Sequence, residues 1–277
     1  MDKYAFSEDL NINYLPKYIK NKYKFAKEHP YWFRDIGTMI FCGHQGAGKT
    51  LSTVNYIYNL QKLYPLMVLV SNVHLTDYPF NAGYSVNDAG ETVIYDLETK
   101  EPIVLGSLEN GEENDIFNEK YSYICIEYDG LDCLKYISNG EYGVVFFIDE
   151  LHLELNSLES KNVDIEVMIE ISQQRKQRKK IIGTSQVYFR LAKPLREQIF
   201  DIVLCENYFG CLQFNKSIDG FKSYEENGKL KAHINKRSIY FHTYEMYGRY
   251  DTYAKMKRYK KEWKGRPRVV TLDLGGV

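Results

Sequence analysis

The sequence predicts an α/β fold in which a mostly parallel β-sheet is flanked by helices. Continuous apolar runs occur at residues 38–42, 66–70 and 144–148, and such runs are typical of strands covered on both faces. Between the first two runs, apolar residues at helical spacing predict a helix over 51–63. Strands that alternate with helices favour parallel pairing, because each crossover returns the chain to the same end of the sheet.

The loop between the first predicted strand and helix reads GHQGAGKT and matches the P-loop pattern G-x-x-x-x-G-K-[ST]. Its glycines let backbone N–H groups turn inward around a phosphate, which the start of the following helix also attracts. Lys49 can reach the β- and γ-phosphates of ATP, and the Thr50 hydroxyl can bind Mg²⁺. The residues predicted to bind the nucleotide are Gly43, His44, Gln45, Gly46, Ala47, Gly48, Lys49, Thr50 and Leu51.

Length and composition suit one large domain with a small appendage. We divide the 277 residues into an N-terminal helical segment (1–35), a P-loop ATPase core (36–205) and a small β-rich appendage with a basic tail (206–277). A formal net charge of -1 means that any nucleic-acid site must be a local patch. Five cysteines without a CxxC pair indicate reduced thiols in a cytoplasm. We find no secretory signal and no run of about 18 apolar residues, so we expect no integral membrane segment.

Two stretches outside the predicted core leave their roles open. The lysine-rich piece 17–27 is either a solvated helix face or a phosphate contact. Residues 76–120 are expected to form an inserted β-hairpin, from short strands at 92–95 and 103–105, with an acidic loop at 109–119. This insertion is either a surface excursion or a contact with a subunit or substrate.

The third apolar run ends in two acids, Asp149 and Glu150, which is the Walker B pattern. A buried strand would deliver Asp149 beside the P-loop, where it can hold Mg²⁺. Glu150 is then placed to polarise a water molecule against the γ-phosphate. The pair therefore favours ATP hydrolysis over phosphoryl transfer to a metabolite.

A helix is expected over 163–180, and its second half is strongly basic. Arg175 and Arg178 are three residues apart and would share a helix face. This face could be solvated, could bind nucleic-acid phosphate, or could supply an arginine finger to a neighbouring subunit. A strand at 181–186 follows and ends at Gln186, which could reach the γ-phosphate or its attacking water.

The last quarter of the chain changes character. A final apolar strand is expected at 202–205, followed by strand pieces at 208–215 and 238–243. Residues 249–268 interleave lysine and arginine with aromatic residues. This composition suits phosphate contact with base stacking, and equally suits a helix that caps a neighbouring subunit.

Taken in order, these features resemble the FtsK/HerA superfamily of P-loop ATPases, which have a RecA/ASCE-like fold. Within it, the chain looks most like Zot-type proteins and bacteriophage genome-packaging ATPases. The details are Ser71-Asn72-Val73 after the second strand, the strand ending at Gln186, and Tyr250-Asp251-Thr252-Tyr253. The likeness covers roughly residues 36–205.

The resemblance implies a pentameric or hexameric ring that hydrolyses ATP with Mg²⁺ between subunits and translocates DNA, which we expect to be double-stranded. It further implies a viral portal or capsid partner, and a place in the host cytoplasm or on a procapsid. By this likeness the catalytic residues are Lys49, Glu150, Gln186 as γ-phosphate sensor, and Arg175 or Arg178 as trans finger, with Thr50 and Asp149 on the metal. Filamentous-phage Zot proteins usually carry a transmembrane helix, which we do not find here. Two alternatives remain open: a nucleotide-gated assembly or morphogenesis protein without translocation, and a replication helicase or helicase loader.

Overall fold

The computed structural model describes residues 14–87, 92–103, 122–157, 164–226 and 229–251. The helices are α1 (Tyr14–Glu28), α2 (Lys49–Leu63), α4 (Cys133–Tyr136), α5 (Ile165–Gln173), α6 (Lys193–Arg196) and α7 (Tyr244–Gly248). The strands are β1 (Gly37–Cys42), β2 (Val68–Ser71), β3 (Ala82–Val86), β4 (Thr92–Asp96), β5 (Pro102–Ile103), β6 (Ile124–Glu127), β7 (Val144–Ile148), β8 (Lys179–Ser185), β9 (Ile199–Tyr208), β10 (Leu212–Asp219), β11 (Tyr224–Glu226), β12 (Lys229–Lys231) and β13 (Ile234–Phe241).

One sheet organises the described chain, with the strand order β13-β10-β9-β1-β8-β7-β2-β6-β3-β4-β5. Its centre, from β9 to β6, is parallel throughout. The strand that precedes the P-loop (β1) and the strand that ends in the acid pair (β7) are separated by β8. The large, mostly parallel sheet flanked by helices confirms the predicted P-loop NTPase fold. Because the strands are parallel, the carboxyl ends of β1, β7 and β8 meet at one edge of the sheet.

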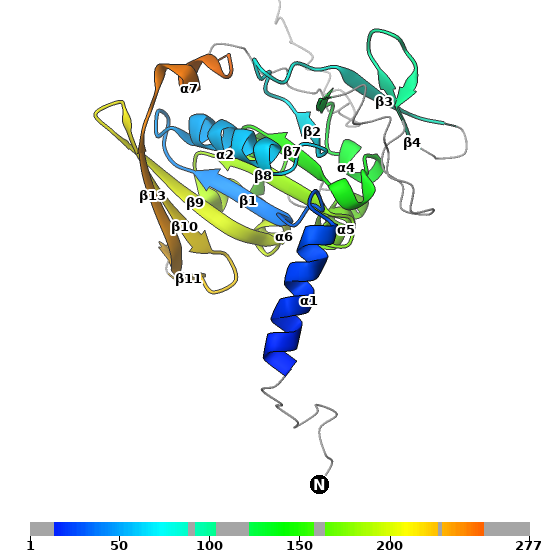
Figure 1. The fold of residues 1–277 in the computed structure, drawn as a ribbon. Coiled ribbons are helices and arrows are strands. Elements are labelled where there is room, and N and C mark those ends of the chain that lie inside the picture. The colour runs from blue at the N-terminus through cyan, green and yellow to red at the C-terminus, as the bar shows by residue number, and fades with distance from the viewer. Residues whose placement is uncertain (1–13, 88–91, 104–121, 158–163, 227–228, 252–277) are drawn as a thin grey trace, which may run out of the picture.

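Helices cover both faces of the parallel centre, as Figure 1 shows for α2 on one face. On that face, Ile57 of α2 packs in a cluster with Phe41 and Phe147. On the opposite face, Ile171 of α5 belongs to a second cluster with Phe146. Successive strand residues therefore point to opposite cores, which is why these strands have continuous rather than alternating apolar sequences.

The helix expected over 163–180 is wrong in its second half. α5 ends at Gln173, residues 174–178 form turns, and β8 begins at Lys179. Arg178 has a left-handed backbone with φ of 51°, which ends any helical continuation. Pairing with β1 and β7 is stronger than the local helical preference, because it buries the whole of β8 in the sheet. Arg175 and Arg178 consequently do not share a helix face.

After residue 205, β10 and β13 extend the main sheet, whereas β11 and β12 form a separate two-stranded sheet. β10 pairs antiparallel with β9, and β13 pairs antiparallel with β10. The strand expected at 208–215 is interrupted by a turn, because Phe209 and Gly210 have left-handed φ values of 56° and 74°. The division into domains stays a prediction.

The predicted hairpin in the insertion is confirmed as β4 and β5, which pair antiparallel with Ile94 opposite Ile103. β3, which was not predicted, pairs with β4 and joins the hairpin to β6. The acidic loop 109–119, the motif residues from 252 onward and most of the basic stretch 249–268 lie outside the described residues.

Candidate active site

The P-loop connects β1 to α2 at the carboxyl edge of the sheet. Gly48 has a left-handed φ of 78°, and a Cβ at this position would lie 2.1 Å from Oε1 of Gln213. At Gly43, a Cβ would lie 2.7 Å from the carbonyl oxygen of Cys205 on β9. Both positions therefore need glycine for a steric reason. The loop opens onto the N-terminus of the 15-residue helix α2, which favours an anion.

Lys49 is the first residue of α2, and its side chain turns back toward the loop. The ammonium Nζ donates a hydrogen bond to the carbonyl oxygen of His44 at 3.1 Å, and the residue is only 8% exposed. The positive charge is therefore held inside the concave side of the loop. This is where the P-loop motif requires a cation for the β- and γ-phosphates.

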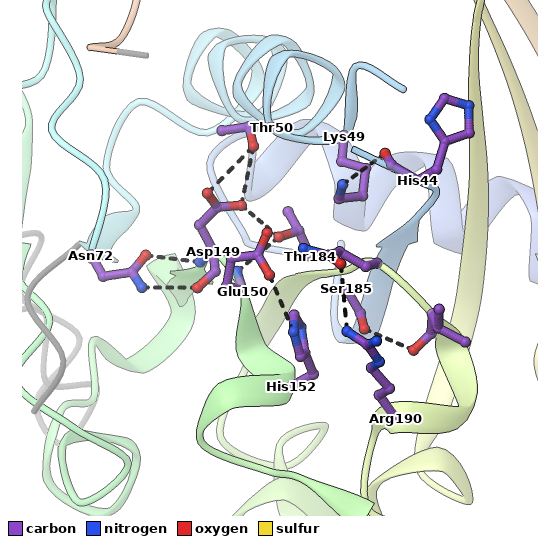
Figure 2. Close-up of polar contacts among 12 residues, drawn as sticks. His44, Lys49, Thr50, Asn72, Asp149, Glu150, His152, Thr184, Ser185 and Arg190 are labelled. Atoms are coloured by element: carbon purple, nitrogen blue, oxygen red, sulfur yellow. Dashed lines mark hydrogen bonds and ion pairs between the residues drawn. The ribbon is translucent and has the colours of Figure 1, made fainter. Parts of the chain in front are cut away.

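Two hydroxyl groups converge on the carboxylate of Asp149, the first acid of the Walker B motif (Figure 2). Thr50 Oγ1 donates to Asp149 Oδ1 at 3.2 Å, and Thr184 Oγ1 donates to the same oxygen at 2.5 Å. Burial raises the pKa of Asp149, and the two hydroxyl donors and the Lys49 charge counteract this only in part. Asp149 forms no ion pair with a cationic side chain in the described ranges.

This donor set fits Mg²⁺. A half-buried carboxylate without an ion-pair partner and a neighbouring hydroxyl are oxygen ligands, and a hard divalent cation prefers these. Within the described part of the chain, no group of three or more His, Cys, Asp or Glu residues could hold a metal by itself. A cation here would therefore take its remaining ligands from phosphate and water, as Mg²⁺ usually does.

The backbone of Asp149 is fixed by Asn72, which lies just beyond β2. The Asn72 amide accepts from the Asp149 N–H at 2.8 Å and donates to the Asp149 carbonyl at 3.1 Å (Figure 2). One side chain thus satisfies both backbone groups at the strand end. In the sequence, Asn72 was only a detail of the family resemblance, and this contact was not predicted.

Glu150 has an unusual backbone, with φ of 55° and ψ of 39°. A left-handed conformation costs a non-glycine residue roughly 1–2 kcal/mol. It is held here by a hydrogen bond of 2.8 Å from the Glu150 N–H to Thr184 Oγ1. Thr184 therefore positions both acids at once, because the same hydroxyl donates to Asp149. Sequence reasoning missed this role, although the strand end Thr184-Ser185-Gln186 was the available signal.

The Glu150 carboxylate lies against His152. Oε2 of Glu150 is 3.3 Å from Nε2 of His152, which is 5% exposed. The pKa of His152 is lowered, first by burial and then by the charges of Arg190 and Lys49. A neutral imidazole with its proton on Nε2 can donate to the carboxylate. Neither His152 nor Arg190 was predicted as a site residue, since neither belongs to a recognised motif.

Gln186 follows β8 directly, at the same edge as the P-loop. The Gly43 N–H donates to the carbonyl oxygen of Ser185 at 3.3 Å, so the two segments are in contact. The side chain of Gln186 accepts a long hydrogen bond of 3.5 Å from Arg190 Nη1. The structure therefore gathers Lys49, Thr50, Asp149, Glu150 and Gln186 at one edge of the sheet.

The two predicted finger arginines lie at the other end of β8. The guanidinium of Arg178 stacks on Trp32, 3.9 Å from the ring centroid, and donates to the carbonyl oxygen of Phe33 at 2.8 Å. Arg175 is exposed in the turn after α5. The arginine finger stays a prediction, and Arg175 is the one whose side chain faces solvent.

A buried glutamine, also missed from the sequence, connects the P-loop to the last strands. Gln213 Nε2 donates to the carbonyl oxygen of Ala47 at 3.0 Å and to Asn215 Oδ1 at 2.8 Å. Its Oε1 lies 3.0 Å from His242 Nε2, at the end of β13. The loop conformation therefore depends on residues more than 160 positions away in the sequence.

The comparisons with known proteins return P-loop proteins of the expected kinds. No protein-family model and no curated protein matches this sequence. Among solved structures, the chain is similar to the N-terminal domain of zonular occludens toxin from Neisseria meningitidis, with 15% identity, coverage of 79% of this chain and 100% of that one, and a TM-score of 0.48. It is also similar to the genome packaging NTPase B204 from Sulfolobus turreted icosahedral virus 2, solved with ATP-gammaS, with 13% identity, 72% and 98% coverage, and a TM-score of 0.42.

A third similar structure is the flagellar accessory protein FlaH from Methanocaldococcus jannaschii, with 15% identity, 75% and 89% coverage, and a TM-score of 0.39. The chain therefore resembles both classes of protein that its motifs indicated. In the described segments, we find no helix with the length and apolar character needed to cross a bilayer.

Proposed function

We propose that this chain is an ATP-hydrolysing motor that translocates double-stranded DNA, as in the packaging of a viral genome. It would act as a ring with ATP at subunit interfaces. The observation that carries the proposal is the clamp on the acid pair, in which Thr184 binds the Asp149 carboxylate and the Glu150 N–H together. A site for binding alone needs the P-loop, but not a second acid held in a strained backbone beside it.

Each residue at the edge has a role that follows from its contacts. The loop N–H groups and Lys49 would bind the phosphates, and Thr50 and Asp149 would hold Mg²⁺. The cation, when bound, supplies neutralisation of the charge on the phosphate oxygens. Glu150 would accept a proton from the attacking water. Gln186 would contact the γ-phosphate side, since it lies at the same edge beside the loop.

We further propose that a neighbouring subunit supplies the arginine side chain, the arginine finger, that completes the site. Arg175 is the candidate because it is exposed, whereas the guanidinium of Arg178 is stacked on Trp32 within its own chain. In a ring, an exposed arginine on one subunit can meet the nucleotide of the next. A portal or capsid component would be the further partner, with the motor in the host cytoplasm or on a procapsid.

The test is the steady-state ATPase rate with and without double-stranded DNA, at low salt and at a protein concentration that permits assembly. DNA should stimulate hydrolysis, and stimulation should weaken steeply with salt because binding through phosphates releases counterions. Glu150→Gln should bind ATP without hydrolysing it. Hydrolysis that is indifferent to DNA in assembled protein would refute translocation.

A mixing experiment tests the shared site. Arg175→Ala lacks the finger but keeps its own acids, and Glu150→Gln lacks the base but keeps the finger. Neither variant alone should hydrolyse ATP, and a mixture should recover activity at interfaces that join an intact site to an intact finger. Arg178→Ala is the matched control, because it makes the same change at a side chain engaged within its own chain. No recovery on mixing would refute the trans finger.

A second function is favoured by the contact between Glu150 and His152. If that contact keeps the Glu150 carboxylate from accepting a proton from water, ATP hydrolysis would be slow. The chain would then serve as a nucleotide-gated assembly protein. Under this alternative, Glu150→Gln would remain functional whenever ATP is bound. Under the motor proposal the same variant would be inactive and would trap ATP-bound rings.

A further inference from the structure

Helix α1 projects from the body of the protein, as Figure 1 shows. Within the described part of the chain, α1 is anchored at its C-terminal end, where the Phe25 ring lies 4.1 Å from the Trp32 ring and Trp32 stacks with Arg178. Residues 15–24 are all exposed. A helix of about 15 residues is only marginally stable in water by itself. The projecting turns therefore gain order when a partner covers them.

The projecting part of α1 has an apolar face with a positive charge within it. Leu15, Tyr18 and Ile19 fall at helical spacing on one face, and Leu15 and Ile19 are 56% and 57% exposed. Lys22 lies on this same face, since it follows Leu15, Tyr18 and Ile19 by seven, four and three residues. Lys20 lies on the opposite face. A surface that covers this face must therefore offer apolar groups and an anion together.

A patch with these properties lies on α4 and α5 of the same protein. Ile165 and Ile169 are one helical turn apart and are 75% and 45% exposed. Around them, the carboxylates of Asp132, Asp164 and Glu166 all contact Nζ of one lysine, Lys135, at 3.0, 2.6 and 3.0 Å. Three negative charges meet one positive charge, so the patch keeps an excess of negative charge.

We propose that α1 of one copy docks on the α4–α5 patch of a second copy. Leu15, Tyr18 and Ile19 would pack on Ile165 and Ile169, while Lys22 would meet the surplus carboxylates. A lipid surface fits less well, because a lysine in the middle of the apolar face is costly in a membrane. A nucleic-acid backbone fits less well too, because three large apolar side chains would face its phosphates.

The contact is head to tail, because α1 and the α4–α5 patch are different surfaces of the chain. Contacts of this kind close into rings when the rotation between copies permits. The inference rests on the proposed function only for the ring, and its test needs neither hydrolysis nor DNA. ATP hydrolysis that DNA does not stimulate in assembled protein would refute the motor proposal. It would leave the proposed contact between α1 and the α4–α5 patch unaffected.

The test compares association by analytical ultracentrifugation over a range of protein concentrations. Lys22→Glu and Glu166→Lys should each raise the concentration for half-maximal association by at least about tenfold, because like charges then meet at the interface. The double variant Lys22→Glu/Glu166→Lys should return to within about threefold of the wild type, since opposite charges are restored. The matched control, Lys20→Glu, makes the same charge change on the opposite helix face and should associate like the wild type. Thermal melts of each variant monitor folding.

A cross-link tests the contact directly. The exposed Cys211 is replaced by serine in every chain, which leaves four buried native cysteines. Chains carrying Ile19→Cys are then mixed with chains carrying Ile165→Cys under mild oxidation. A disulfide-linked pair that forms in the mixture, and in neither chain alone, is the expected result.

Other occupants of the α1 face would be recognised in the same series. Association of Lys22→Glu that equals the wild type would overturn the proposal. So would binding of the wild type to phosphatidylserine vesicles, or to double-stranded DNA, that Lys22→Glu abolishes without changing association.

Discussion

The hydroxyl of Thr184 is the most informative atom to remove from the site. Thr184→Val keeps the shape of this fully buried side chain and deletes two hydrogen bonds, one to the Asp149 carboxylate at 2.5 Å and one from the Glu150 N–H at 2.8 Å. A hydrogen bond to a charged group contributes about 1.5–3 kcal/mol, and an unpaired N–H costs about 1–3 kcal/mol. We therefore expect a loss of roughly 3 kcal/mol in the free energy of unfolding. This corresponds to a fall in Tm of about 6–12 °C for a chain of this size.

Thr184→Val should lower kcat by a larger factor than it changes the KM for ATP. Misplacing a reacting group by about 1 Å can cost 100-fold in rate, so kcat should fall by about 100-fold. The phosphate cradle is untouched, so the KM for ATP should change by less than about threefold. The hydrogen bond from Thr184 lowers the pKa of Asp149. Its loss should therefore raise that pKa and move the acid limb of the pH–rate profile to higher pH.

The assay is phosphate release at saturating Mg²⁺ and ATP, with thermal unfolding monitored in parallel. Thr184→Ser is the matched control, because it keeps the hydroxyl and loses only a methyl group. It should retain kcat to within about tenfold of the wild type. If Thr184→Val kept wild-type kcat and Tm, the hydroxyl would not position the acid pair and the reasoning would be refuted.

Three further predictions follow from single contacts. Gly48→Ala should abolish ATP binding and destabilise the fold by about 2 kcal/mol or more, because the left-handed backbone and Gln213 both exclude a Cβ at this position. Normal ATP affinity in a titration would contradict this prediction. Gln213→Leu removes the hydrogen bond to the Ala47 carbonyl, so it should cost about 1–3 kcal/mol in chemical denaturation and weaken ATP binding. The pKa of His152 is lowered by burial, so the unfolded chain binds a proton that the folded chain refuses as the pH falls below about 7. Stability should decrease on acidification, with up to about 1.4 kcal/mol per pH unit from His152. His152→Gln should flatten the curve of Tm against pH, and an unchanged curve would show that another group causes it.

Prediction from local sequence was wrong where pairing between strands distant in the sequence decided the secondary structure. The basic stretch after α5 has strong helical character, yet Lys179 and Lys180 enter the sheet. They can do so because each finds an acid, Glu170 at 3.3 Å and Asp35 at 2.7 Å. A buried lysine needs such a partner, and the partner of Lys180 lies 145 residues away in the sequence.

What the sequence determined by itself were the features that depend on neighbours along the chain. The P-loop conformation needs its glycines, its lysine and its threonine in fixed order, and the acid pair needs only a buried strand before it. These requirements are met within short segments, so the fold class and the residues of the two motifs could be predicted. The arrangement around them was decided only by the tertiary structure. Thr184 meets Glu150 across 34 residues, Asn72 meets Asp149 across 77, and Gln213 meets the P-loop across 166. Each contact depends on which strands lie side by side, and the long-range burial of the whole sheet decides that.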